Sequence, residues 1–185
     1  MILATAPTWP EIETERLRLV SPASPGFDAT AAYLMPGARR FVDQHPDEEA
    51  AWWSIATIIG HWHLRGYGHF AVIDKATGLD VGLVGPWYPR GWPEPELSWQ
   101  LLDGAEGKGF ATEAARAVLD WLFQDKGWAS CVSLVDPDND RSVAMVKRLG
   151  ARPEGMFHHR MTGDLRIWRH LPRTAAGRRL LEGLQ

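Results

Sequence analysis

The chain has 185 residues, of which 45% are hydrophobic and 23% charged, a balance that suits one globular domain with a sizeable core. Its formal net charge is -3 and no basic face is apparent, which argues against a nucleic-acid partner. No apolar run approaches the roughly 20 residues of a membrane helix, and the first residues show no signal-peptide pattern. The single cysteine, Cys131, excludes an internal disulfide and suits a reducing compartment, so we expect a cytoplasmic protein.

The first half of the chain carries strand and helix signals in turn. Alternating hydrophobicity predicts the first strand, Asp47 is suited to cap the longer helix, and a turn at residues 75–78 predicts a hairpin. In chain order, the predicted elements are a strand over 17–20, a short helix over 27–34, a helix over 47–66, and two strands over 70–73 and 80–87.

The second half combines further helices with four strands. Apolar residues of the helix that begins at Thr112 form one stripe, as in a helix packed on a sheet. The late helix follows a cap around Asn139, and Gly150 suits its C-terminal end. The predicted elements are a strand over 96–102, a helix over 112–123, a strand over 130–135, a helix over 141–149, two strands over 156–161 and 165–171, and a frayed helix from Arg173.

Together these elements predict one domain of the α/β class, more narrowly of the α+β type. Hairpins require antiparallel neighbours, whereas helices between other strands allow crossovers. We therefore expect a mixed, mostly antiparallel twisted sheet of about seven strands with helices on both faces. The domain is expected to occupy residues 1–185, with 172–185 as a peripheral C-terminal tail.

A glycine-rich turn at residues 107–109 is the most informative feature of the chain. It follows an apolar strand closely and leads into an alanine-rich helix. Backbone N–H groups in such a turn converge at the helix N-terminus, where they can hold a phosphate or diphosphate. The P-loop motif of nucleotide hydrolases and kinases does not fit, because it requires a glycine at Leu102 and a serine or threonine at Gly109.

Four stretches of the chain, in order, resemble the N-acetyltransferases of the GNAT family, and within it the RimJ/RimL-like branch. They lie at residues 14–19, 66–72, 107–114, and 139–142 with 147–150. The resemblance implies acetyl transfer from acetyl-CoA to a primary amine, either a protein N-terminus or a small molecule. The alternative is a CoA or acyl-CoA sensor with the same fold and no catalysis. A homodimer is compatible with both.

The resemblance also implies where coenzyme A binds. The strand before the glycine turn would diverge from the strand after it, and the pantetheine arm would lie between them. The implied cofactor-binding residues are Trp99, Leu101, Leu102, Glu106, Gly107, Lys108, Gly109, Phe110, Ala111, Thr112, Asn139 and Ser142. No metal is expected, because no carboxylate or cysteine at ligand spacing completes a set with the seven histidines.

Two positions depart from the family pattern. Glu106 stands where the family usually has glutamine or arginine, and a carboxylate beside a diphosphate is unfavourable unless it points to solvent. All three tyrosines precede the late helix, on which many family members place a tyrosine as general acid. Ser142 is the candidate acid in its place, and the alternative is an exposed or helix-stabilising serine.

A general base matters most if the acceptor resembles lysine. Deprotonating a lysine ammonium at pH 7 costs about 4.6 kcal/mol, against about 1.4 kcal/mol for an α-amino group. The candidate bases are Glu96, Glu94 and His69. Glu96 shares a strand face with Ser98 and Gln100 and could act through a water. Alternatively, Glu96 is a solvated carboxylate and His69 a core residue.

Overall fold

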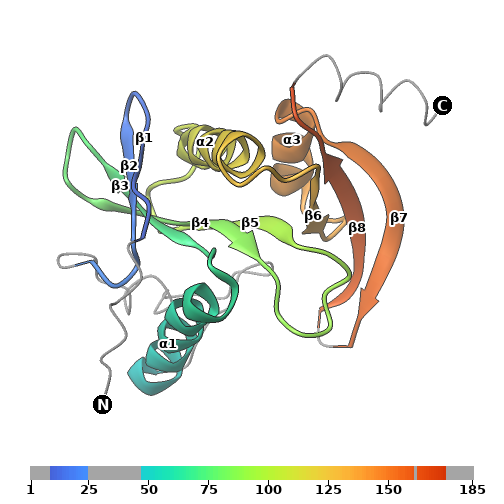
Figure 1. Cartoon of the computed structure of the whole chain (residues 1–185), viewed down its shortest axis with the longest axis horizontal. Helices are drawn as coiled ribbons and strands as arrows, with labels where there is room; N and C mark the ends of the chain where they lie inside the picture. The colour runs from blue at the N-terminus through green and yellow to red at the C-terminus, as the bar shows by residue number, and fades with distance from the viewer. Residues whose placement is uncertain (1–8, 25–46, 161, 174–185) are drawn as a thin grey trace.

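The computed structural model describes residues 9–24, 47–160 and 162–173. The helix predicted over 27–34 lies outside these residues, as does the frayed helix predicted at the C-terminus beyond Arg173. The described chain contains three helices and eight strands (Figure 1). In chain order they are β1 (Ile12–Glu13), β2 (Leu17–Val20), α1 (Glu48–Arg65), β3 (Phe70–Asp74), β4 (Asp80–Trp87), β5 (Glu96–Leu101), α2 (Phe110–Gln124), β6 (Cys131–Val135), α3 (Asp140–Arg148), β7 (Arg152–His159) and β8 (Gly163–His170).

The strands form one mixed sheet in the order β1-β2-β3-β4-β5-β6-β8-β7. All neighbours are antiparallel except β5 and β6, which are parallel because α2 connects them as a crossover. Helix α1 covers one face of the sheet, and α2 and α3 cover the other (Figure 1). The predicted class, the mostly antiparallel pairing and the helices on both faces are confirmed.

Two strands at the edges of the sheet differ from the prediction. Strand β1 pairs only two residues with β2, too few to show an alternating pattern in the sequence. Strand β7 begins at Arg152 rather than Met156 and continues through Pro153. An edge strand tolerates proline, and the register of β7 shifts between Pro153 and Met156. The sheet therefore has eight strands instead of the expected number of about seven.

Short-range capping interactions fix the ends of α1 and the start of α3. The Asp47 carboxylate accepts a hydrogen bond from the N–H of Ala50 at 2.9 Å, and Gly66 ends α1 with a left-handed φ of 73°. The Asn139 side chain accepts from the N–H of Ser142 at 3.2 Å. These caps were predicted from the sequence because each involves residues close together in the chain.

Helix α2 packs on the sheet through a stripe of small and branched side chains. Ala114, Ala115, Val118 and Leu122 are all fully buried. The alanines let the helix backbone approach β4 and β5 closely, and the burial contributes about 25 cal/mol per Å² of apolar surface. Helix α2 begins at Phe110, two residues earlier than predicted, so its N-terminus directly follows the glycine turn.

Candidate functional site

The glycine turn ends at the N-terminus of α2. Gly107 and Gly109 have φ angles of 76° and 80°, a region that residues with a Cβ rarely adopt. Gly109 is the N-cap of α2 and has no side chain to cap it. The first backbone bond of the helix runs from the N–H of Glu113 to the Gly109 carbonyl, so the earlier N–H groups of the first turn, from Phe110 on, point toward the glycine turn. Such converging amides suit phosphate oxygens.

The other predicted cofactor residues of this segment lie around these amides. Lys108 is exposed at the turn, and Thr112 is half-buried in the first turn of α2. Phe110 and Ala111 are buried against the sheet, with exposed fractions of 8% each. Their side chains therefore anchor the helix, and it is their main-chain N–H groups that face the turn.

Strands β5 and β6 diverge close to this turn. Their pairing consists of one register position, Glu96 opposite Val132. The Ser133 hydroxyl then donates to the Leu97 carbonyl at 2.7 Å, and within the described residues the two strands pair no further. Strand β6 continues to pair with β8 as far as Val135. This is the divergence that the family resemblance implies.

The main chain of β5 presents alternate residues to the side on which the strands diverge. The Leu97 carbonyl points to that side, and backbone groups alternate along a strand, so those of Trp99 and Leu101 do too. Leu102 differs, because its N–H donates to the Val81 carbonyl on β4 at 2.8 Å. The main-chain groups of Trp99 and Leu101 are therefore placed to contact a pantetheine arm, as expected from the resemblance. The N–H of Leu102 is not, because it is bonded to β4.

The N-terminus of α3 lies beside the glycine turn. Arg141 Nη1 forms an ion pair with Glu106 Oε2 at 2.6 Å. The Glu106 carboxylate is exposed, and it is also paired with a cation that offsets its charge. Asn139 caps α3 and Ser142, half-buried, lies in the first turn. The Arg141 contact brings these two predicted residues to the same side of the turn as Glu106.

The polar residues of β5 face away from α2. Gln100 lies opposite Leu83 on β4, and Leu83 belongs to the core beneath α1. Opposed residues of antiparallel strands share a face, and side chains alternate along a strand. Glu96, Ser98 and Gln100 therefore lie on the α1 face of the sheet. Where β5 and β6 diverge, the glycine turn and α2 thus lie on one face of the sheet, and the polar side chains of β5 lie on the other.

Glu96 occupies the point at which β5 and β6 begin to diverge. It is only 6% exposed, so it is not the solvated carboxylate considered above. Its Oε1 accepts from Trp92 Nε1 at 2.6 Å, and its Oε2 accepts from the Leu134 N–H at 3.2 Å. Burial raises the pKa of Glu96 to about 7, although both hydrogen bonds oppose the rise. A carboxyl group with this pKa can accept or donate a proton near neutral pH.

The other two candidate bases are differently placed. Both oxygens of Glu94 accept from Arg169, at 2.6 and 2.7 Å. His69 Nε2 lies 2.6 Å from the Ser98 hydroxyl, and its ring stacks on Trp87. Burial lowers the pKa of His69 to about 3, so the ring stays neutral near pH 7. Among the three, Glu96 has the pKa and the position best suited to a base.

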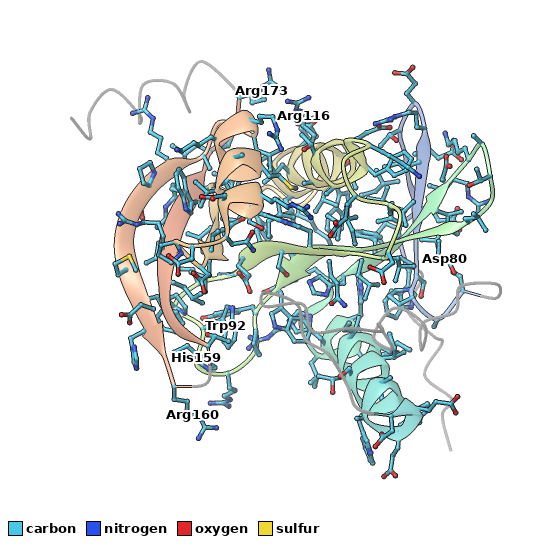
Figure 2. All side chains as sticks on the ribbon, turned by 180° about the vertical axis from the view of Figure 1, so that it is seen from behind. Asp80, Trp92, Arg116, His159, Arg160 and Arg173 are labelled. Carbon is cyan, nitrogen blue, oxygen red and sulfur yellow. The ribbon has the colours of Figure 1, made fainter. Side chains whose placement is uncertain are left out.

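The sequence did not indicate the role of Trp92. Its indole N–H is the donor to Glu96, and its ring lies against His159 and Phe157 of β7, with centroid separations of 4.7 and 6.4 Å. Figure 2 shows Trp92 and His159 next to each other at one end of the sheet. A tryptophan in a proline-rich loop, four residues before a strand-opening glutamate, was the only available signal.

Three further expectations concern a metal site, a membrane-spanning helix and the single cysteine. Within the described ranges, no group of three His, Cys, Asp or Glu side chains is placed to hold a metal ion. None of the helices described here is long and apolar enough to cross a membrane. Cys131 is buried, and burial raises the pKa of its thiol, as expected for an unreactive cysteine.

Known proteins of similar sequence and structure support one family. Residues 16–152 match the acetyltransferase (GNAT) domain. An acetyltransferase from Agrobacterium tumefaciens str. C58 is 30% identical with a TM-score of 0.77, over 91% of this chain and 98% of that one. RimL, a ribosomal L7/L12 α-N-protein acetyltransferase in complex with coenzyme A, shares the fold at 15% identity and a TM-score of 0.71, over 88% and 98% of the chains.

Two relatives from Bacillus subtilis (strain 168) align over shorter regions. YkkB is 32% identical over 97 residues, which are 49% of this chain and 56% of YkkB. The N-acetyltransferase YnaD is 32% identical over 62 residues, 34% of this chain and 36% of YnaD. The alignments thus span about half of these relatives or less. With a domain match over most of its length, the chain belongs to the GNAT acetyltransferase family.

Proposed function

We propose that this protein transfers the acetyl group of acetyl-CoA, the donor that its family uses, to a primary amine. The amine nitrogen attacks the thioester carbonyl carbon directly. The new N–C bond forms as the C–S bond breaks, the nitrogen loses a proton, and the thiolate gains one. Acceptors of two kinds fit the RimJ/RimL-like branch that we infer: a protein N-terminus or a small-molecule amine.

The glycine turn and the diverging strands would hold the coenzyme. The N–H groups of residues 107–112 suit the diphosphate, and the main chain of Trp99 and Leu101 suits the pantetheine arm. Asn139 and Ser142 lie on the α3 side of the turn. In this arrangement the thioester would lie where β5 and β6 diverge, which is also where the Glu96 carboxylate lies.

The buried Glu96 carboxylate is the observation that carries the proposal. A base with a pKa of about 7 is half deprotonated at neutral pH and can receive the amine proton, directly or through a water. The leaving thiolate needs less help, because protonated thiol and thiolate differ by only about 2 kcal/mol at pH 7. Ser142 is the candidate donor of that proton, and its contribution is expected to be the smaller one.

An amine panel tests this proposal. Release of free CoA thiol from acetyl-CoA is measured with α-amino peptides, lysine-like amines and small alkylamines as acceptors. We expect turnover with at least one class. Glu96→Gln should lower kcat/KM by about 10²- to 10⁴-fold, and Ser142→Ala by less. Glu94→Gln is the matched control, because this carboxylate is bonded to Arg169.

The panel also tests the alternative of a non-catalytic sensor. A sensor would bind CoA or acetyl-CoA and release no thiol with any acceptor. Equal losses in Glu96→Gln and Glu94→Gln would contradict the assignment of the base. They would leave acetyl transfer itself in place.

A further inference from the structure

The tight turn between β1 and β2 is bonded directly to the start of α2, although the two lie about a hundred residues apart in sequence. Glu113, in the first turn of α2, accepts three hydrogen bonds from this turn and forms an ion pair with its arginine. Its Oε1 accepts from the Thr14 hydroxyl at 2.6 Å and the Arg16 N–H at 3.0 Å. Its Oε2 accepts from Arg16 Nε at 2.7 Å and forms an ion pair with Nη2, 2.6 Å away.

Arg16 also holds the glycine turn itself. Its remaining terminal nitrogen, Nη1, donates to the Lys108 carbonyl at 3.0 Å. Its guanidinium lies over the Phe110 ring, 4.8 Å from the centroid. One planar side chain therefore contacts the carbonyl of the turn and the first residues of the helix that follows it.

This contact fixes the direction of an amide that the cofactor would use. The peptide bonds of the described chain are all trans, and in a planar trans peptide the C=O and N–H point in opposite directions. The Lys108 carbonyl points at Arg16, so the N–H of Gly109 points away from Arg16. A left-handed residue at a helix start lets consecutive amides converge, so we expect that amide to join those of the α2 N-terminus.

We propose that Arg16, anchored by Glu113, positions the glycine turn for the diphosphate of coenzyme A. The inference rests on the proposed function only in taking coenzyme A as the ligand. Arg16 is a positioning residue here: its donors are directed at protein acceptors and not at the cofactor. Glycine turns are conformationally free, so without this contact the turn loses part of its preorganisation and the ordering must occur on binding.

The alternative is that the same bonds only fasten β1 and β2 to the body of the protein. The ion pair is 44% exposed on the arginine side and 20% on the glutamate side, and such pairs contribute little to stability in general. A fastening role would affect all acyl donors equally. A positioning role affects only donors that carry a diphosphate.

Two acyl donors separate these roles. Acetyl-CoA carries the diphosphate, and acetyl-pantetheine carries the same thioester and arm without it. For Arg16→Gln and Glu113→Gln we expect kcat/KM with acetyl-CoA to fall about tenfold or more, the effect of losing charge-assisted hydrogen bonds that order the turn. With acetyl-pantetheine, kcat/KM should stay within about twofold of the unchanged protein. Most of the loss should appear in KM, with kcat nearly kept.

Arg16→Lys distinguishes positioning from simple attraction. Lysine keeps the positive charge but cannot bond Glu113 and the Lys108 carbonyl with one rigid fork. We expect Arg16→Lys to lose nearly as much as Arg16→Gln with acetyl-CoA. A lysine variant that behaves like the unchanged protein would overturn the proposal, since charge alone would then suffice.

Glu13→Gln is the matched control. It removes a neighbouring ion pair, between Glu13 and Lys75, that does not contact the glycine turn. Equal losses with both acyl donors, or a loss in the control as large as in Arg16→Gln, would also overturn the proposal. The calorimetric Kd for CoA gives a readout that does not require turnover. If the unchanged protein binds CoA but acetylates no amine, that result contradicts the proposed function alone. The Kd values of the variants then still test this inference.

Discussion

At the scale of single residues, the surroundings of Glu96 determine what this carboxyl group can do. Burial favours the neutral acid, while the indole of Trp92 and the N–H of Leu134 favour the carboxylate. The balance leaves the pKa near neutrality, unlike the strongly lowered pKa of His69 on the same face. Glu96 must be deprotonated to act as a base, so activity should rise with pH through its pKa.

Trp92→Phe tests this balance. The substitution keeps an aromatic ring against β7 and removes the N–H donor to Glu96. Losing a donor to the carboxylate raises the pKa of Glu96, and we expect the midpoint of the pH profile of kcat/KM to move up by about one unit. Trp53→Phe, on the exposed side of α1, is the control. An unchanged midpoint, or one that moves down, would contradict Glu96 as the titrating base.

The sequence indicated Glu96 as a candidate base but not the residues that surround it. Strand alternation placed it on a face with Ser98 and Gln100, which is a local property. Its burial depends on the loop that carries Trp92 folding back and on β6 diverging. The pairing of Glu94 with Arg169 likewise joins residues 75 positions apart. Contacts of this range leave no periodic trace in the sequence, so they could not be predicted.

At the scale of elements, the glycine turn is held from two sides, by the β1–β2 turn and by the N-terminus of α3. The sequence predicted the turn itself and the cap of α3, because caps and left-handed glycines are set by neighbours in the chain, although α2 begins two residues earlier than predicted. It did not predict the pairing of Glu106 with Arg141. In that ion pair, the positive charge of Arg141 offsets the negative charge of Glu106, which would otherwise repel a diphosphate at the turn.

The two members of this pair should affect CoA binding in opposite directions. Arg141→Gln removes a cation that offsets the Glu106 charge beside the diphosphate, so we expect the calorimetric Kd for CoA to rise several-fold. Glu106→Gln removes a negative charge and frees Arg141, so the Kd should fall. Both effects should shrink at high salt, because the pair is exposed. A weaker complex in both variants would mean that the pair acts by shape and not by charge.

At the scale of the whole molecule, buried neutral histidines make the free energy of unfolding depend on pH. Burial lowers the pKa of His69 to about 3 and that of His170 to about 4, and it also lowers the pKa of His61. In the unfolded chain they titrate near pH 6.5. Protonation below pH 6.5 therefore favours the unfolded chain. Glu96 acts oppositely, because its raised pKa favours the folded state at low pH and the benefit is lost as the pH rises to about 7.

The histidines outnumber Glu96, so the free energy of unfolding should increase between about pH 5 and pH 7, by at most about 1.4 kcal/mol per pH unit for each histidine. Urea denaturation across this range measures the slope. His170→Gln should make the slope shallower, whereas Glu96→Gln should make it steeper because the opposing contribution is removed. A slope unaffected by both substitutions would contradict these assignments.

The order of the strands could be predicted only in outline. The hairpin at residues 75–78 follows from a local turn signal, and it required antiparallel neighbours. The insertion of β8 between β6 and β7, and the single paired position between β5 and β6, depend on how the whole chain packs. The single paired position between β5 and β6 matters most for function, because the proposed path of the cofactor follows the divergence of these two strands.

A crystal structure of the protein with coenzyme A tests this account most directly. We expect the diphosphate oxygens to accept hydrogen bonds from the N–H groups of residues 107–112, and the pantetheine arm to lie between β5 and β6 with its sulfur near Glu96 and Ser142. A diphosphate bound away from the glycine turn, or an arm outside the diverging strands, would contradict it.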